Sequence, residues 1–169
     1  DGPRSYNSKL AFQKKISTLH SLAPHDVSII HYLLGYEEFG NVICIGENFS
    51  NNEQNDRDEI SFICKNVSVK FNLSWYYPEK IRTMSITGEK GLIFWDEEKQ
   101  TVKLIENIWL DDRFNYEPKV TTFSIESNPL RNELEHFVEC VKTGKKPISD
   151  IENALQVAKN LDLLSKGSF

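Results

Sequence analysis

The residues best suited to acid–base chemistry lie in the segment Ser21-Leu-Ala-Pro-His25-Asp26. A histidine in the first turn of a helix feels the positive end of the helix dipole, which favours the neutral imidazole and its use as a base near neutral pH. The same field stabilises a carboxylate such as that of Asp26. His25 is therefore a candidate general base. The residues alone also support a second interpretation, because a His-Asp pair at a helix start is more often a capping arrangement.

The sequence carries no other pattern of reactive residues. Gly-x-Gly-x-x-Gly, the P-loop, Gly-x-Ser-x-Gly and His-Glu-x-x-His are all missing, so we expect no cofactor-binding residues in this chain. The other three histidines share no i,i+4 helical face with His25, and the three cysteines form no Cys-x-x-Cys pair. We therefore expect neither a metal site nor a disulfide framework, and the cysteine usage favours a reducing compartment.

A helix over residues 24–34 must position His25. Val27, Ile30 and Leu34 repeat at helical spacing, and Gly35 follows as a C-cap. Pro24 suits the first helical position, where a missing N–H costs nothing. The preceding residues 1–20 are polar and mixed, with a weak alternation over 9–19 that could form an edge strand.

Short β-rich runs follow the first helix at residues 42–45, 59–64, 67–75, 81–87, 92–95 and 101–105. Their short connections predict antiparallel neighbours, with a two-residue turn at Lys65-Asn66 between the second and third runs. We expect a meander of five or six strands. The polar stretch 48–58 has almost no apolar residue, so we expect a mobile loop that contributes nothing to the core. A second irregular connection is expected over about 107–118.

Two helices are predicted after the strands. Asn128-Pro129 resembles an N-cap followed by an N1 proline, and it precedes an apolar stripe at helical spacing that ends near Gly144. Ser149-Asp-Ile-Glu152 is a capping box. The buried side that we predict for this last helix comprises Ile151, Ala154, Leu155, Ala158 and Leu161.

These elements predict an α+β fold in which an open, mainly antiparallel sheet is covered by helices on one face. A bare apolar sheet face would mark an interface, and self-association through it is the natural expectation. The alternative is that the sheet aromatics all lie under the helices. These aromatics are Trp75, Tyr77, Trp95 and Trp109.

The chain has 169 residues, with 20 Lys and Arg against 25 Asp and Glu and a formal net charge of −5. This length suits one domain over residues 1–169. The acidic balance argues against nucleic-acid and anionic-membrane partners, which are held mainly by clustered Lys and Arg. Neither a membrane-spanning run nor a leader is found in the sequence, so we expect a cytoplasmic protein.

Several segments together resemble the C-terminal domain of the Gfo/Idh/MocA oxidoreductases over about residues 19–165. The segments are Leu22-Ala-Pro-His-Asp-Val-Ser-Ile-Ile30 with Leu33-Leu-Gly35, Ser74-Trp75, Pro78-x-Lys80-x-Arg82, Ile86-x-Gly88-x-Lys90-Gly91, Trp95-Asp96, Glu133-Leu-Glu-His-Phe137 and Thr143-Gly-Lys-Lys-Pro147-Ile-Ser-Asp150. The resemblance implies one open sheet with helices on one face, whose bare face packs on another subunit in a homodimer or homotetramer.

The resemblance also implies a function. Full chains of the family carry an N-terminal Rossmann domain that binds NAD or NADP, and the C-terminal domain shapes the site for a sugar or nucleotide-sugar and supplies a catalytic histidine. His25 stands at that histidine's position. The family commonly has an aspartate four residues earlier, where this chain has Ser21. The expected function is thus the substrate-binding and dimerisation domain of an NAD(P)-dependent sugar oxidoreductase, inactive without its cofactor domain. The alternative is a non-catalytic binding or oligomerisation module that kept the fold and lost the chemistry.

Overall fold

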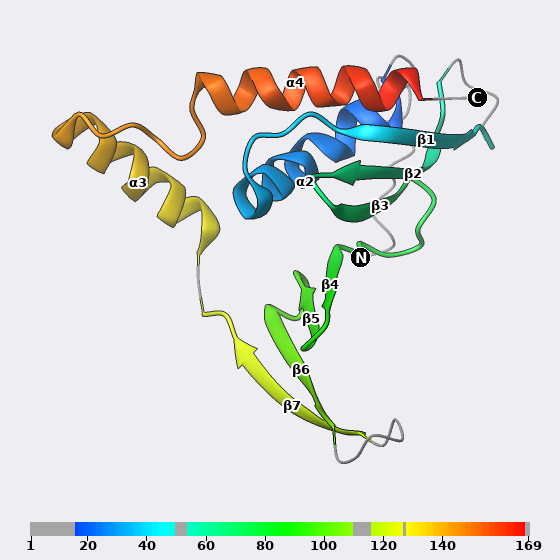
Figure 1. Cartoon of the computed structure of the whole chain (residues 1–169). Helices are drawn as coiled ribbons and strands as arrows, with labels where there is room; N and C mark the ends of the chain where they lie inside the picture. The colour runs from blue at the N-terminus through cyan, green and yellow to red at the C-terminus, as the bar shows by residue number, and fades with distance from the viewer. Residues whose placement is uncertain (1–15, 50–53, 110–115, 127, 168–169) are drawn as a thin grey trace. The chain divides into compact units, whose positions relative to one another are not determined.

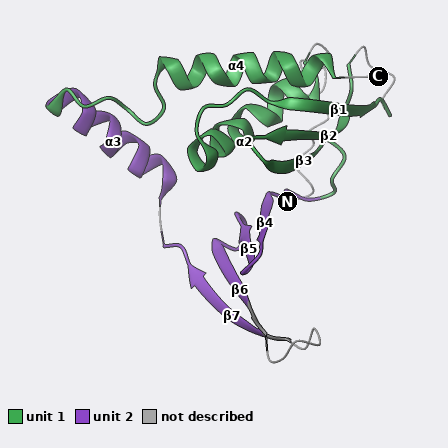
Figure 2. Cartoon of the chain, viewed as in Figure 1, with its two compact units in different colours: residues 1–78, 143–169 green, residues 79–142 purple. Residues whose placement is uncertain are grey.

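A computed structural model of the chain describes residues 16–49, 54–109, 116–126 and 128–167, without the side chains of residues 107–117. Its residues group into two compact units, one formed by residues 1–78 and 143–169 and the other by residues 79–142 (Figure 2). Most of the predicted edge strand over 9–19 lies outside the described residues, and its last residues belong to a helix.

The first unit is a three-stranded antiparallel sheet with two helices packed on it (Figure 1). The sheet order is β1-β2-β3. The core lies between the inner face of β2 and the helices, with Val27 from one helix and Leu164 from the other fully buried. In chain order the elements are α2 (Thr18–Leu34), β1 (Gly40–Glu47), β2 (Arg57–Cys64), β3 (Val67–Ser74) and α4 (Ile151–Lys166).

The alternation in β2 confirms the prediction made from its sequence. Ile60, Phe62 and Cys64 are buried, and the residues between them are half-buried on the outer face. Phe62 stacks on Phe39 with ring centroids 4.2 Å apart. The two-residue turn after Cys64 joins β2 to β3 in an antiparallel pair, as expected.

The second unit contains a four-stranded antiparallel sheet of order β4-β5-β6-β7 and helix α3. The described chain therefore has seven strands in two hydrogen-bonded sheets, rather than a single meander of five or six. Part of the connection predicted over 107–118 is strand: β7 holds Pro118, which an edge strand tolerates because it has no ladder partner on one side. The bounds are β4 (Thr83–Gly88), β5 (Gly91–Asp96), β6 (Thr101–Trp109), β7 (Tyr116–Ser124) and α3 (Pro129–Thr143).

The predicted start of the first helix at Pro24 is wrong. Helix α2 begins at Thr18, with Ser17 as N-cap accepting from the backbone N–H of His20, and Pro24 lies inside the helix. Its end is as predicted, since Gly35 has φ +89° and donates its N–H to the carbonyl of His31.

The predicted buried side of α4 is also wrong for most of its residues. Ile151 is 83% exposed and Leu155 53% exposed, whereas Asn153 and Asn160 are buried together with Leu164. Of the predicted set, Leu161 alone packs against the core. Two faces of α4 have apolar residues, and the hydrogen bonds between its asparagines and α2 select the face that carries Asn153 and Asn160.

Candidate functional site

Ser21 and His25 lie one turn apart on the same face of α2, and both are exposed. His25 is seven positions after Thr18, the first residue of the helix. The field at a helix start falls off within the first turn. The prediction that His25 sits at a helix entrance is therefore wrong, and so is the dipole argument for its neutral form. Asp26 likewise lies outside the first turn.

A buried carboxylate from strand β2 fixes the start of α2. Oδ2 of Asp58 accepts hydrogen bonds from the Thr18 hydroxyl and from the backbone N–H of Leu19, the latter at 3.1 Å. Oδ1 accepts from Nδ2 of Asn55 at 3.0 Å. The first N–H groups of a helix have no partner within it, and a carboxylate is favoured there. This contact explains why the helix starts six residues earlier than its sequence suggests.

Residues of the stretch 48–58 therefore build part of the core, contrary to the prediction. Asp56 and Asp58 are each 2% exposed. Asp56 accepts from the backbone N–H of Phe49 at 3.0 Å. The local sequence shows only that this stretch is polar. It does not show that the aspartates are buried, because their hydrogen-bond partners come from distant segments. Residues 50–53 lie outside the described residues.

A polar seam joins α2 to α4. The Ser28 hydroxyl donates to Oδ1 of Asn153 at 3.3 Å, and Nδ2 of Asn160 lies 2.8 Å from Nε2 of His31. His31 is 2% exposed, and burial lowers its pKa because the charged imidazolium loses solvation. Sequence reasoning missed His31, since a histidine on an apolar helical face carries no signal of its own.

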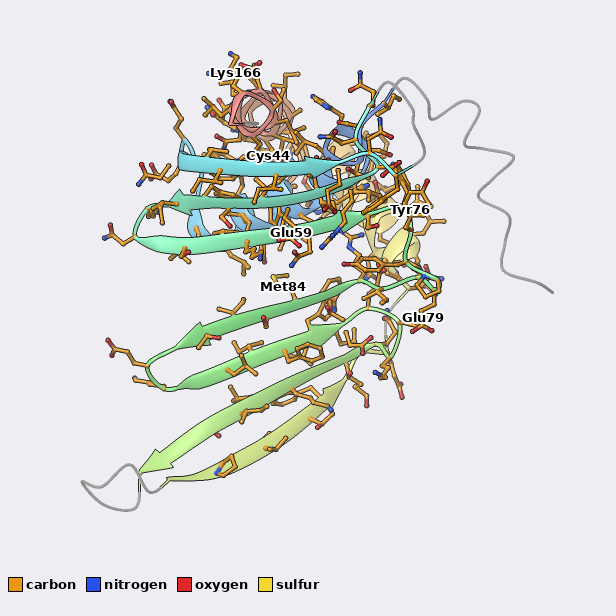
Figure 3. All side chains as sticks on the ribbon, turned by 90° about the vertical axis from the view of Figure 1, so that its right-hand side faces the viewer. Cys44, Glu59, Tyr76, Glu79, Met84 and Lys166 are labelled. Carbon is orange, nitrogen blue, oxygen red and sulfur yellow. The ribbon has the colours of Figure 1, made fainter. Side chains whose placement is uncertain are left out.

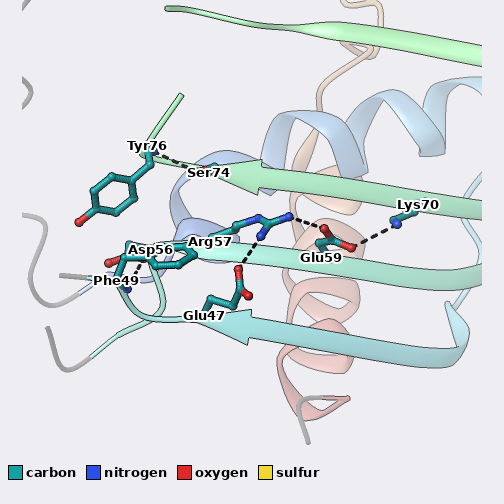
Figure 4. A network of polar contacts seen from close by, with 8 residues as sticks. All are labelled: Glu47, Phe49, Asp56, Arg57, Glu59, Lys70, Ser74 and Tyr76. Carbon is teal, nitrogen blue, oxygen red and sulfur yellow. Dashed lines mark hydrogen bonds and ion pairs between the residues drawn. The ribbon is translucent and has the colours of Figure 1, made fainter. Parts of the chain in front are cut away.

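A network of charged side chains lies on part of the outer face of the first sheet (Figure 4). Arg57 binds Glu47 at 2.6 Å and Glu59 at 2.5 Å, and Lys70 lies 3.2 Å from Glu59. These side chains are partly exposed, so each pair contributes little to stability. Every charge in the network has an opposite partner, which favours a role in aligning the strands.

One face of the second sheet carries apolar side chains on all four strands. The strand registers place Ile86 beside Ile93 and Val102 beside Phe123 on this face. Ile86 and Ile93 are each 41% exposed, and Phe123 is 51% exposed. Figure 3 labels Met84, which belongs to the same face. We call this set the β4–β7 face, and its residues are Met84, Ile86, Ile93, Trp95, Val102, Leu104 and Phe123.

The sheet aromatics do not all lie under helices. Trp75 and Trp95 are half-buried, and Tyr77 is 45% exposed. The guanidinium of Arg82 lies 6.0 Å from the centroid of the Trp95 ring. The side chain of Trp109 lies outside the described residues.

The described residues do not fit a dinucleotide cofactor by themselves. The pyrophosphate of such a cofactor sits at a glycine-rich turn between a strand and a helix within a parallel β-α-β unit. Every strand pair in the described part of the chain is antiparallel, and the sequence lacks the glycine motif. Over the same residues, no group of three His, Cys, Asp or Glu side chains is arranged to hold a metal ion. Nor does any described helix have the length and hydropathy needed to cross a membrane.

Comparison with known proteins identifies the family. The family model for the C-terminal alpha/beta domain of the Gfo/Idh/MocA oxidoreductases matches residues 11–167. The chain belongs to this family. No curated protein matches the sequence.

Solved structures share the fold of this Gfo/Idh/MocA domain at low sequence identity. UDP-N-acetylglucosamine 3-dehydrogenase GnnA from Acidithiobacillus ferrooxidans has a TM-score of 0.78 and 15% identity, over 92% of this chain and 48% of its own. The 3-ketoreductase KijD10 from Actinomadura kijaniata, in complex with TDP-benzene and NADP, has a TM-score of 0.63 and 14% identity, over 90% and 47%.

A third structure widens the chemistry found on this fold. Biliverdin reductase from Synechocystis, in complex with biliverdin and NADP+, has a TM-score of 0.59 and 17% identity, over 86% of this chain and 45% of its own. The chain thus spans about half the length of the structures it matches. The Gfo/Idh/MocA fold alone does not select a substrate, because one fold hosts different functions.

Proposed function

We propose that this Gfo/Idh/MocA domain is the substrate-binding and oligomerisation half of an NAD(P)-dependent oxidoreductase that acts on a sugar or nucleotide-sugar. The family match over residues 11–167 carries the proposal. Two similar structures, named as a UDP-N-acetylglucosamine dehydrogenase and a 3-ketoreductase, support the substrate class. An N-terminal Rossmann domain would hold the NAD or NADP. The chain alone is then expected to be inactive and to give no heat of NAD(P) binding in calorimetry.

His25 is proposed as the general acid/base of the site. Its imidazole is exposed on α2, so a substrate hydroxyl can approach one ring nitrogen and transfer its proton to it. Ser21, one turn earlier on the same face, is proposed as the polar neighbour that contacts the substrate. Because His25 is exposed, removing its side chain should leave the fold intact.

Kinetics on the complete two-domain protein test the role of His25. A positioned general base contributes ~10²–10⁴-fold, so His25→Ala should lower kcat by about that factor with an unchanged melting temperature. Ser21→Asp should preserve or raise kcat. His20→Ala, which alters an exposed histidine on the same helix, is the matched control. Unchanged turnover in His25→Ala would remove the catalytic assignment.

The alternative is a non-catalytic binding or oligomerisation module with the same fold. Ser21 favours it, because the family commonly has aspartate at that position. The reading frame upstream of Asp1 distinguishes the two proposals at little cost. A β-Gly-x-Gly-x-x-Gly-α unit within ~150 residues supports the enzyme, and its absence supports the module.

The β4–β7 face is proposed to bind a second copy of the chain in a homodimer or homotetramer. Its apolar side chains cross four strands, and Phe123 is still 51% exposed. Ile93→Arg should convert the oligomer to monomer in light scattering, whereas Ile45→Arg on the first sheet should not. A monomeric wild-type chain at high micromolar concentration would refute this interface. The free thiols Cys44, Cys64 and Cys140 fit the cytoplasmic location that we propose.

A further inference from the structure

One buried polar cluster joins three segments of the first unit: α2, the residues that follow it, and α4. Asn160 of α4 is 1% exposed and His31 of α2 is 2% exposed. The amide of Asn160 contacts both His31 and the backbone of the residues after α2. Neither side chain belongs to the proposed catalytic site, so a role for this cluster does not depend on the proposed function.

Two backbone groups fix the orientation of the Asn160 amide. Oδ1 accepts from the backbone N–H of Phe39 at 3.1 Å, and Nδ2 donates to the carbonyl of Glu37 at 2.8 Å. Turning the amide by 180° would set Nδ2 against the N–H of Phe39 and Oδ1 against the carbonyl of Glu37, so neither bond would survive. Nδ2 therefore directs its second hydrogen to Nε2 of His31, 2.8 Å away.

His31 can accept this hydrogen only as a neutral ring. Nε2 must present its lone pair, which leaves the ring hydrogen on Nδ1. Protonation of Nε2 would set its N–H against the N–H of Asn160, with two donors and no acceptor between them. The closed cluster therefore excludes the imidazolium by hydrogen-bond geometry, and burial lowers the pKa of His31 in the same direction.

The groups that face His31 provide no negative charge for an imidazolium. From the residues after α2, Tyr36 and Phe39 place their rings 5.5 Å and 5.7 Å from the imidazole centroid. Glu37 contributes its carbonyl to the cluster, while its carboxylate pairs with the lysine of the β2–β3 turn. The facing group from α4 is the Asn160 amide. Nδ1 of His31 has no hydrogen-bond partner in the described part of the chain, and the phenol of Tyr36 gains no charge on acidification.

We propose that His31 and Asn160 form an acid-sensitive latch, which holds α4 against α2 while the imidazole is neutral and releases it when the imidazole is protonated. The two helices lie side by side on the first sheet (Figure 1). Release would expose Leu161 and Leu164, which pack in the core. The closed and open states thus differ both in one bound proton and in exposed apolar surface.

Hydrogen exchange of the 15N-labelled chain between pH 5.5 and 7.5 tests the latch. The amide of Phe39 is the reporter, because its N–H is bonded to Asn160. After correction for intrinsic exchange, its opening constant should rise about tenfold per pH unit from 6.5 down to the pKa of the closed state, since the open state binds one more proton. Amides of β5, in the second unit, are the reference and should show no such rise. An opening constant of Phe39 that is independent of pH would overturn the proposal.

The imidazole 15N resonances of His31 test the closed state without a mutation. At pH 7.5, the Nδ1 resonance should have the shift of a protonated ring nitrogen and the Nε2 resonance that of an unprotonated one. A hydrogen on Nε2 would refute the latch, because the donor–donor contact would then already exist in the neutral state.

Two variants distinguish the latch from a general loosening of the helices. Asn160→Asp presents a carboxylate oxygen that accepts from a protonated Nε2 of His31, so protection of Phe39 should increase as the pH falls, opposite to wild type. Ser28→Ala removes the contact with Asn153, which has no titratable group, and should lower protection by the same factor at every pH. A wild-type slope in Asn160→Asp, or a lost slope in Ser28→Ala, would refute the latch. Where Asn160→Asp does not fold, Ser28→Ala and the imidazole resonances decide.

Discussion

Replacement of Asp58 by alanine tests whether this carboxylate, rather than the local sequence, fixes the start of α2. The side chain is 2% exposed and accepts hydrogen bonds from Thr18, Leu19 and Asn55. Its removal leaves two donors buried in the core, because Thr18 is 0% and Leu19 4% exposed. We therefore expect α2 to lose its first turn before the unit unfolds.

The magnitude follows from these contacts. Hydrogen bonds to a charged group contribute about 1.5–3 kcal/mol each, and a buried donor left without a partner costs about 1–3 kcal/mol. The cost of burying the carboxylate in the wild type offsets part of this sum. Asp58→Ala should lower the free energy of unfolding by about 3 kcal/mol, which corresponds to roughly 6–12 °C in Tm. Asp58→Asn should lose less, because its amide oxygen still accepts from Leu19.

Thermal unfolding and amide hydrogen exchange measure both effects. In Asp58→Ala, protection should fall first at the amides of residues 19–23. Asp162→Ala is the control, since Asp162 is an exposed partner of Lys166 and its loss should cost only about 0.3–0.5 kcal/mol. A loss below about 1 kcal/mol in Asp58→Ala, or full protection of residues 19–23, would refute the anchoring role.

Two further predictions concern the same unit. Gly46→Ala should lower the free energy of unfolding, measured in urea, by about 1–3 kcal/mol. A Cβ at this position would lie 1.7 Å from Nδ2 of Asn55 and would break the contact of Asn55 with Asp58. Gly40→Ala is the control and should have a much smaller effect, because a Cβ there meets nothing within 4 Å. Burial lowers the pKa of His31 below its ordinary value of 6.5. Between the two pKa values the unfolded chain therefore binds a proton that the folded chain does not. The free energy of unfolding should fall as the pH decreases below about 6.5, until the pKa of the folded state is reached. His31→Phe should flatten this dependence. Equal slopes in wild type and His31→Phe would contradict the reasoning.

The sequence by itself determined those features that depend on local periodicity. Alternation over 59–64 places Ile60, Phe62 and Cys64 on one face whatever the partner is, since neighbouring side chains of a strand point to opposite sides. The short turn at Lys65-Asn66 leaves the strands no alternative to antiparallel pairing. The motifs around His25 likewise indicated the family, because they are read directly from the chain.

Tertiary structure decided where these elements begin and which faces they bury. The start of α2 depends on Asp58, which is 40 positions away from Thr18 in the chain, and no local pattern reports that contact. The earlier start of α2 also places His25 in the helix interior instead of the expected first turn, and it brings Ser21 into the helix on the same face as His25. Asn160 is not part of the predicted buried side of α4, yet its partners Phe39 and His31 satisfy it in the core. A buried polar group is stable only where a distant segment completes its hydrogen bonds, and that information belongs to the folded chain.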